Sequence, residues 1–281
     1  MRAVVITGAS TGIGRACALA LDAKGFRVFA GVRKESDEQA LREAGSASLT
    51  PVRLDVTDAE SIAAATELVA ADVGDAGLAG LVNNAGTTLP CPVQYLSIDG
   101  FRGQLEVNLT GPLAVTQSLL PLLVRGRGRV VNVTSLAGRL GTPLMAPYVA
   151  AKHGLEGLSD VLRLELGQLG VHVAVIEPGY ISTAMRGKLT RDTEAVIRSL
   201  PIEGQSRYGE QLTKLAQTIN HHAANGSPPA VVAAAVEHAL TSRRPRTRYP
   251  VGVGAHRLLL LRRLLTDRRF DRLILRVARG S

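Results

Sequence analysis

Three side chains in the middle of the chain could together move a proton. Tyr148 and Lys152 are four residues apart, so on a helix they lie one above the other on the same face. A free phenol, with a pKa of about 10, is too weak a base at neutral pH, but a neighbouring ammonium favours the phenolate and lowers that pKa. The Ser135 hydroxyl, thirteen residues earlier, can stabilise a substrate oxygen as negative charge develops on it. We therefore expect Tyr148 to act as a general acid and base.

A glycine-rich turn near the N-terminus could bind a phosphate group. Residues 7–14 read TGASTGIG, between a β-branched run and an Ala/Leu-rich run. Glycines allow a sharp turn and close approach to a pyrophosphate, and the helix N-terminus that follows offers free N–H groups. The spacing is not the G-x-G-x-x-G of the standard dinucleotide fingerprint, so a purely structural turn is the alternative. The residues expected to contact a dinucleotide here are Gly8, Ser10, Thr11, Gly12, Ile13 and Gly14.

Strands and helices must alternate to position these residues. β-branched runs predict buried parallel strands at 3–7, 27–31, 51–54, 79–83, 129–134 and 171–176. Helical spacing predicts helices at 12–24, 36–44, 58–72, 99–124 and 148–168. We expect Asp58 to cap the third helix, and Pro112 and Pro121 to kink or shorten the long helix at 99–124. The alternation predicts an α/β fold: one doubly wound, Rossmann-type parallel sheet with helices on both faces.

The regular alternation ends after Pro178-Gly179. We expect residues 180–227 to form a helical lid over the substrate, with short helices near 192–200 and 206–223. A helix at 229–242 and a last strand at 246–251 complete a catalytic domain over residues 1–252. Residues 253–281 form a separate extension, in which 255–279 has the pattern of a basic amphipathic helix or helix pair.

Taken in order, these motifs resemble the short-chain dehydrogenase/reductase family over about residues 1–250. The glycine-rich turn is followed by Asn83-Asn84-Ala85-Gly86 after the fourth strand, Asn108 in the next helix and Ser135 at the end of the fifth strand. Tyr148-Val-Ala-Ala-Lys152 then opens a helix, and Pro178-Gly179 follows the sixth strand, with Thr183 soon after. One such motif is a weak signal, whereas six in order and in the expected structural context are a strong one.

The resemblance implies a role for each matching residue in hydride transfer between a nicotinamide cofactor and a carbonyl or alcohol. Lys152 would hold the ribose hydroxyls of the nicotinamide, and Asn108 would anchor a water near that lysine. Asp55 and Val56 would meet the adenine ring, although Asp55 could equally cap the following helix. The nicotinamide would rest near Pro178, Gly179, Tyr180 and Ile181, with Thr183 on its carboxamide, and Asn83, Asn84, Ala85 and Gly86 would line the cofactor site. No metal is expected.

The end of the second predicted strand favours NADP(H) over NAD(H). An acid at this position hydrogen-bonds the ribose 2′-hydroxyl of NAD and repels the 2′-phosphate of NADP. By the family pattern Val32 occupies the position of that acid, and Arg33 follows it. A guanidinium can bind a phosphate in a bidentate way. The alternative is that Arg33 is a solvated surface residue.

Charge is concentrated at the C-terminal end of the chain. The 281 residues carry a net charge of +9, but from Arg243 onward there are twelve Arg, no Lys and two Asp, which leaves −1 for residues 1–242. This tail could pack on the catalytic domain or a second subunit, which we favour, or contact an anionic membrane peripherally. Nucleic-acid binding is not expected, because no aromatic platform accompanies the arginines.

The sequence also gives expectations for the cellular compartment and the oligomeric state. With two cysteines, Cys17 and Cys91, we expect free thiols in a reducing cytoplasm rather than a disulfide framework. The first strand begins almost at Met1, so no signal peptide is expected. No run is expected to reach the ~20 apolar residues that span a bilayer. The long helices at 99–124 and 148–168 resemble the family's usual dimer faces, so we expect a homo-oligomer.

The expected lid and the loop before Tyr148 are mainly apolar, which favours a lipophilic alcohol or ketone. The residues expected to line the substrate pocket are Leu140, Leu144, Met145, Tyr180 and Met185. The segment after Pro178-Gly179 and the RYPVG run at 248–252 are similar to the steroid and retinol dehydrogenase branches of the family. Two alternatives stay open: a ketoreductase acting on carrier-bound acyl chains, and an NADP(H)-binding sensor without turnover.

Overall fold

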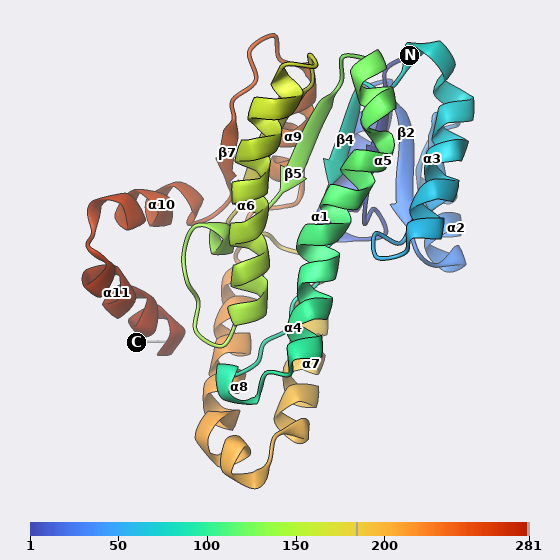
Figure 1. Ribbon diagram of the computed structural model, residues 1–281. Helices are drawn as coiled ribbons and strands as arrows, with labels where there is room; N and C mark the ends of the chain where they lie inside the picture. The colour runs from blue at the N-terminus through green and yellow to red at the C-terminus, as the bar shows by residue number, and fades with distance from the viewer. Residues whose placement is uncertain (184, 280–281) are drawn as a thin grey trace.

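Seven parallel strands form one sheet in the order β3-β2-β1-β4-β5-β6-β7 (Figure 1). The computed structural model describes residues 1–183 and 185–279. The order reverses between β1 and β4, as in a doubly wound sheet, so the predicted fold class is confirmed. The strands are β1 Ala3–Ile6, β2 Arg27–Val32, β3 Leu49–Arg53, β4 Gly80–Asn83, β5 Arg129–Val133, β6 His172–Pro178 and β7 Arg248–Val251.

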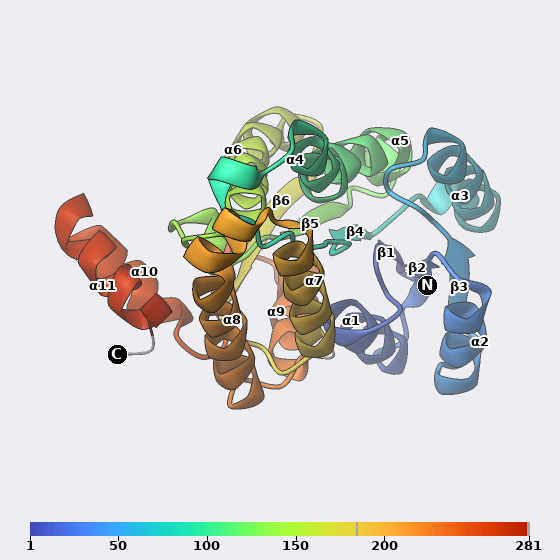
Figure 2. The ribbon, with the colours of Figure 1, turned by 90° about the horizontal axis from the view of Figure 1, so that it is seen from below.

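Helices cover both faces of the sheet (Figure 2). Apolar side chains of α1, α2 and α9 pack on one face, and those of α3, α5 and α6 pack on the other. The helices that flank the sheet are α1 Gly12–Ala23, α2 Glu35–Ala44, α3 Ala59–Val73, α4 Ile98–Leu105, α5 Gly111–Arg125, α6 Ala146–Gly167 and α9 Ala230–Thr241. Those beyond it are α7 Met185–Ser199, α8 Ile202–Ala224, α10 Ala255–Leu264 and α11 Asp267–Arg279.

Both edge strands contain a proline. Pro51 lies within β3 and Pro250 within β7, the first and last strands of the sheet. Proline cannot donate a backbone hydrogen bond, so it is tolerated in an edge strand and discourages pairing with a further strand. The sheet therefore ends at these two strands.

The predicted helix at 99–124 is two helices joined by a π-helical turn, η3 Glu106–Thr110. Pro112 lies in the first turn of α5, where its missing N–H is not needed, whereas Pro121 lies inside α5 without ending it. The run Ile98–Arg125 is long and apolar enough by composition to cross a membrane, so the expectation that no run reaches that length was wrong. Its apolar residues include Val115 and Leu119, which pack against the sheet.

The last two helical pairs lie outside the sheet layers. Helices α7 and α8 pack against each other and extend beyond the carboxyl ends of the strands (Figure 1). Helix α10 contacts β7 and the short turn η4 Leu136–Gly138, and α11 contacts α8. A separate apolar cluster holds this tail in place, with Leu136, Leu140, Ala255 and Phe270 buried at its centre.

Candidate active site

The glycine-rich turn leaves the N-terminus of α1 open. Gly8 and Gly12 adopt positive φ angles of 66° and 56°, which glycine accepts without strain. A Cβ at Gly14 would lie 2.2 Å from the Gly8 carbonyl oxygen, so the turn has no room for a side chain there. Thr11, the N-cap residue, makes no side-chain capping hydrogen bond. The first N–H groups of α1 are therefore available to an anion, which fits the pyrophosphate of a dinucleotide.

Asn84 connects this turn to the end of β4. Its amide nitrogen donates to the carbonyl oxygens of Thr7 and Gly8, each at 3.0 Å. The Thr7 hydroxyl accepts from the backbone N–H groups of Asn84 and Ala85, also at 3.0 Å. These bonds fix the two segments on either side of the point where the strand order reverses, which is where ligands bind in doubly wound sheets.

Contrary to expectation, the Asn83 side chain does not line the cofactor site. It is 2% exposed, and its amide nitrogen donates to Thr116 Oγ1 at 3.0 Å and to Asn132 Oδ1 at 2.9 Å. Those partners lie on α5 and β5, inside the domain. The side chain is structural because residues alternate between the two faces of a strand, and this one faces the helix layer.

An open cavity of about 760 Å³ lies over the N-terminus of α1. Its walls include Gly12 and Arg15 of α1, Thr183 of the segment after β6, and Pro228 before α9. The volume is typical of a small-molecule site. Arg15, which the sequence analysis did not select, places a cation beside the free N–H groups. Its position directly after Gly14, in the first turn of the helix, was the available signal.

Tyr148 and Lys152 lie in the first two turns of α6, and Ser135 follows β5. The Lys152 ammonium lies 5.9 Å from the centroid of the Tyr148 ring, and it donates to the Val133 carbonyl oxygen at 2.9 Å. The Ser135 hydroxyl accepts from the Ala137 N–H at 3.2 Å, and it lies close enough to the Tyr148 phenol to lower its pKa. The structure thus brings together the three side chains that the spacing selected.

In the protein without a cofactor, the pKa of Tyr148 is not lowered as expected. Burial raises the pKa of Tyr148, and the hydrogen bond from Ser135 opposes this shift. The expected lowering is therefore not reached by the protein without its cofactor, because desolvation outweighs the stabilisation of the phenolate. Burial lowers the pKa of Lys152 to about 8, and the charge of Glu156 acts in the opposite direction.

Asn108 lies in the π-helical turn and is fully buried. Its side chain accepts from the Thr87 N–H and donates to the Thr87 carbonyl oxygen, both at 2.9 Å. A Cβ added to Gly86 would lie 3.4 Å from Asn108 Oδ1 and 3.9 Å from Lys152 Nζ. Asn108 therefore holds the segment after β4 against the lysine.

The end of β2 places Arg33 where a cofactor's adenosine could reach it. Val32 is buried, whereas the Arg33 side chain is 71% exposed, with Nη1 3.8 Å from Asp55 Oδ2. Asp55 accepts from the N–H and the hydroxyl of Thr57, and Val56 is buried beside it. Against the effect of burial, these hydrogen bonds and the charge of Arg33 lower the pKa of Asp55.

The two carboxylates near the start of α3 have separate roles. Asp58, not Asp55, caps the helix, accepting from the N–H groups of Glu60 and Ser61. The predicted cap at Asp58 is confirmed, and the alternative reading of Asp55 as that cap was wrong. Asp55 instead closes a local turn with Thr57 and faces Arg33.

The segment after Pro178-Gly179 crosses the carboxyl edge of the sheet. Gly179 has no room for a side chain, because a Cβ would lie 2.2 Å from the Val253 carbonyl oxygen. Tyr180 stacks on His222 of α8, with ring centroids 4.6 Å apart, and Ile181 is buried. Thr183 lies against Gly12, because a Cβ added to Gly12 would lie 3.4 Å from the Thr183 Cβ.

The predicted substrate residues do not form one wall. Leu140 is buried in the apolar cluster that holds the tail, with Leu136 and Phe270. The prediction that it lines the substrate pocket was therefore wrong. Met145 is buried and pairs with Cys91, and Leu144 adopts a positive φ of 63° immediately before it. Met185 begins α7, but its side chain lies outside the described part of the chain.

Comparison with known proteins identifies the kind of enzyme this site resembles. The family described as short chain dehydrogenase matches residues 2–194. The chain is 42% identical to human 17-beta-hydroxysteroid dehydrogenase type 6 over 258 residues, 90% of this chain and 81% of that protein. It is 44% identical to human retinol dehydrogenase 16 over 265 residues, 92% of this chain and 82% of that protein.

Solved structures agree with this result. A short-chain dehydrogenase from Streptomyces avermitilis superposes with a TM-score of 0.77 at 27% identity, over 99% of this chain and 98% of that one. An actinorhodin polyketide ketoreductase variant with NADPH superposes with a TM-score of 0.71 at 30% identity, over 86% of this chain and 90% of that one.

Proposed function

The chain belongs to the short-chain dehydrogenase/reductase family, whose members are oxidoreductases acting on CH–OH groups, and on this basis we propose that it interconverts a lipophilic alcohol and its ketone or aldehyde with NADP(H). The observation that carries the proposal is the contact of Ser135 with Tyr148 beside Lys152, at the carboxyl edge of the sheet. A bound nicotinamide supplies or accepts the hydride, and the protein supplies position and the proton.

Tyr148 is the general acid and base of this proposal. In reduction its phenol donates a proton to the substrate oxygen, and in oxidation its phenolate removes the proton from the alcohol. Ser135 donates a hydrogen bond to the same oxygen, which stabilises the charge that develops there. Lys152 favours the phenolate electrostatically and binds the nicotinamide ribose. The Asn108 side chain is hydrogen-bonded to the main chain of Thr87. The water relay that we assign to Asn108 therefore starts from its main-chain carbonyl.

The cofactor lies, in this proposal, from the end of β2 to the segment after β6. The open N-terminus of α1 and Arg15 bind the pyrophosphate, and Arg33 binds the 2′-phosphate in place of the acid that would select NAD. Thr183 meets the nicotinamide carboxamide. The other proposed contacts are Gly8, Ser10, Thr11, Ile13, Gly14, Asp55, Val56, Asn84, Ala85, Gly86, Pro178, Gly179 and Ile181.

The substrate class follows from the relatives and from the helices beyond the strands. The two human relatives are named for hydroxysteroids and retinol, and we propose the same lipophilic class here. Residues 180–227 form the lid of a catalytic domain at 1–252. Leu144 and Met145 face the substrate from the loop before α6, and Tyr180 faces it from the start of the lid.

The test is hydride transfer by the purified protein over a panel of steroids, retinoids, aliphatic ketones and acyl thioesters, with each nicotinamide cofactor. We expect turnover with a steroid or retinoid and a preference for NADP(H). Turnover with acyl thioesters alone would identify a carrier-dependent ketoreductase instead. Cofactor binding without turnover on any of the panel would identify a sensor.

We also propose that the exposed side of the tail contacts membranes peripherally from the cytoplasm. Leu260 and Leu264 of α10 are 56% and 70% exposed among the arginines of the tail. Exposed leucine beside arginine suits an anionic lipid surface. Vesicles of phosphatidylglycerol and phosphatidylcholine should retain the protein at low salt, and the double variant L260D/L264D should not bind. Failure of the unmodified protein to bind would remove this proposal.

A homodimer is proposed through α5 and α6. Val161 and Leu164 of α6 are 49% and 64% exposed, on the side turned away from the sheet. Light scattering after size-exclusion chromatography should give twice the chain mass for the wild type and the chain mass for Leu164→Glu. A monomeric wild type at micromolar concentration would contradict this arrangement.

A further inference from the structure

A stripe of polar side chains runs along one face of α6. Tyr148, Lys152, Glu156 and Asp160 follow one another at intervals of four residues, so each lies about one helical turn beyond the last. The first two form the proposed catalytic pair. Glu156 is 5% exposed, although the proposed chemistry gives it no part. A buried carboxylate this close to a catalytic lysine requires partners and calls for an explanation.

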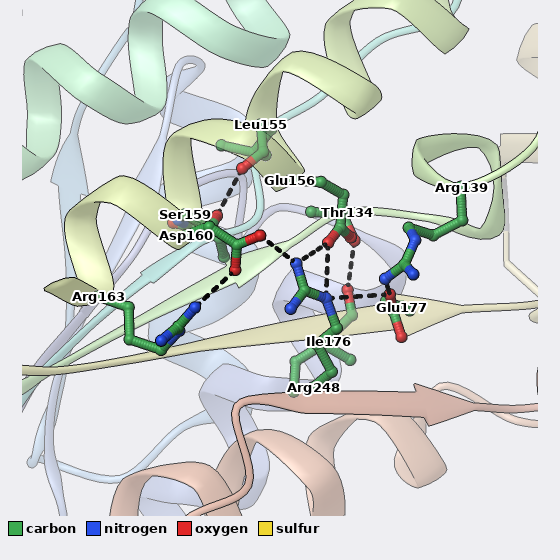
Figure 3. Close-up of polar contacts among 11 residues, drawn as sticks. Thr134, Arg139, Leu155, Glu156, Ser159, Asp160, Arg163, Ile176, Glu177 and Arg248 are labelled. Atoms are coloured by element: carbon green, nitrogen blue, oxygen red, sulfur yellow. Dashed lines mark hydrogen bonds and ion pairs between the residues drawn. The ribbon is translucent and has the colours of Figure 1, made fainter.

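Glu156 is held on two sides (Figure 3). The Thr134 hydroxyl lies 2.6 Å from Glu156 Oε1 and 3.0 Å from the Ile176 carbonyl oxygen, and can donate to either. Arg248, from the edge strand β7, contacts Glu156 Oε2 through Nε at 3.2 Å and through Nη2 at 3.1 Å. Nη2 of the same guanidinium donates to Asp160 Oδ2 at 2.9 Å. Glu156 is thus paired with a guanidinium from a strand far along the chain.

A second buried carboxylate completes the network. Glu177, at the end of β6, is 1% exposed. Its Oε1 lies 3.2 Å from Arg139 Nη1 and 3.7 Å from Arg248 Nε. Burial and the charge of Glu156 raise the pKa of Glu177, and the two arginines oppose the shift. Two buried carboxylates therefore share one guanidinium between them.

The network joins the segments that carry Ser135, the Tyr148–Lys152 pair and the Pro178-Gly179 turn. Thr134 immediately precedes Ser135, and Arg139 lies just after η4 in the same loop. Glu177 precedes the Pro178-Gly179 segment, and Glu156 shares α6 with the catalytic pair. A Cβ on Gly138 would lie 3.0 Å from Glu156 Cγ, so the loop packs directly on this carboxylate.

We propose that Glu156, held by Arg248 and Thr134 one helical turn beyond Lys152, is a positioning residue whose carboxylate supports the charge of Lys152 beside Tyr148. This rests on the proposed function, since it assigns Lys152 a role in that reaction. Through Arg248, the edge strand β7 takes part in the chemistry without touching substrate or cofactor.

The electrostatic balance around Lys152 supports this role. Lys152 is 4% exposed, burial alone disfavours its charge, and Glu156 opposes that effect. On α4 and the π-helical turn, Asp99, Arg102 and Glu106 are exposed to solvent, where charges are screened. On α6 itself, His153 and Glu165 are exposed and Arg163 pairs with Asp160. The remaining charged or titratable groups near Lys152 are Tyr148 and Asp160 of α6, Arg139 after η4, Glu177 of β6 and Arg248 of β7.

The variant Glu156→Gln removes the charge and can keep the hydrogen bonds. Its amide oxygen can accept from Arg248, and its amide nitrogen can donate to the Thr134 hydroxyl, which still has the Ile176 carbonyl as acceptor. Arg248 keeps Asp160 and Glu177 as partners. Asp160→Asn is the matched control, because it also removes a carboxylate from Arg248 but lies two turns from Lys152.

The measurement is the titration of Lys152 by lysine-selective NMR on the full chain. The sequence has five lysines, and Lys24, Lys34, Lys188 and Lys214 are exposed. We expect the wild-type Lys152 signal to titrate at about pH 8. Glu156→Gln should lower this midpoint by about one unit, and the control should leave it where it is. A midpoint in Glu156→Gln equal to or above the wild-type value overturns the proposal.

Activity supplies the second readout. The alkaline limb of the pH–rate profile should move down with the Lys152 midpoint, so that Glu156→Gln loses about tenfold in kcat above that limb. If Glu156→Gln does not fold, the charge-compensated pair E156Q/R248Q takes its place. Its midpoint is still expected below the wild type, because Glu156 and not Arg248 is among the charges that shift Lys152. The NMR titration needs no substrate. A protein that is inactive on the whole panel would therefore contradict the proposed function, whereas the titration would still test the effect of Glu156 on Lys152.

Discussion

The Lys152 ammonium lies 5.9 Å from the centre of the Tyr148 ring, one turn further along α6. Both groups are set in a site that disfavours their charged forms, since burial raises the pKa of the phenol and lowers that of the ammonium. In this state the pair is poorly suited to proton removal at neutral pH. The positive charge of an oxidised nicotinamide would favour the phenolate, so we expect the site to become active only when its cofactor is bound.

Burial of Lys152 should reduce stability at neutral pH. Folding lowers the lysine pKa from 10.5 to about 8, which at pH 7 amounts to about 3 kcal/mol of lost stability. Between those two pKa values the unfolded chain binds the proton and the folded chain does not, so this loss shrinks as the pH rises. Lys152→Met should therefore unfold at higher urea than the wild type at pH 7, by up to about 3 kcal/mol, and the difference should fall to about 1 kcal/mol at pH 9.5. A difference that is constant or grows with pH would contradict the assignment.

Cofactor preference should follow the end of β2. The variant V32D/R33A introduces the acid that binds a ribose 2′-hydroxyl and removes the exposed guanidinium. We expect the ratio of kcat/KM for NADPH to that for NADH to fall by about two orders of magnitude, since a charge-assisted pair and a repulsion both change. Lys34→Ala is the control, because it removes a neighbouring cation that is also exposed. Unchanged NADPH preference in the double variant would show that Arg33 is only a surface residue.

The turn before α1 should not tolerate a methyl group. Gly14→Ala would place a Cβ 2.2 Å from the Gly8 carbonyl oxygen and 2.5 Å from Asn84 Nδ2. The turn must then open, and fluorescence titration should show weaker NADPH binding by at least about tenfold. Gly103→Ala, on α4 with no atom within 4 Å of the new Cβ, should bind normally and gain up to about 1 kcal/mol of stability. Equal NADPH affinity in both variants would refute the pyrophosphate site.

The tail should be held to the catalytic domain by Phe270. This ring is 3% exposed and packs with Leu136 and Leu140 of the loop after Ser135. Phe270→Ala should weaken the contact by about 3 kcal/mol, so that trypsin cleaves among the tail arginines many times faster. Leu264→Ala, at a side chain that is 70% exposed, should leave the cleavage rate close to that of the wild type. Equal protection of both variants would show that the tail is held by other contacts.

Much of this fold could be predicted because its signals are local. The β-branched runs, the cap at Asp58 and the four-residue spacing of Tyr148 and Lys152 each depend on neighbours in the sequence. The break at 106–110 was harder to predict, because Gly111-Pro112 permits either a kink or a continuous helix. The burial of Leu140 could not be predicted, because the tail helices that cover it lie more than a hundred residues away.

The Glu156 network shows the same limit within the site. The stripe at 148, 152, 156 and 160 was visible in the sequence and could have pointed to Glu156. Its partner Arg248 could not be identified, because β7 reaches α6 only through its pairing with β6, where Val175 lies opposite Arg248. Pairing between distant segments depends on the whole packed structure rather than on any local pattern.

The role of Tyr148 can be tested by following deuteride transfer from 4-deuterated NADPH to a ketone that the wild type accepts. Mass spectrometry of the alcohol should show one deuterium at the carbinol carbon for the wild type and for Tyr180→Phe. For Tyr148→Phe the rate should be lower by at least about a hundredfold, with the dissociation constant for NADPH unchanged. A Tyr148→Phe variant that transfers deuteride within tenfold of the wild-type rate would contradict the assignment of Tyr148 as the proton donor.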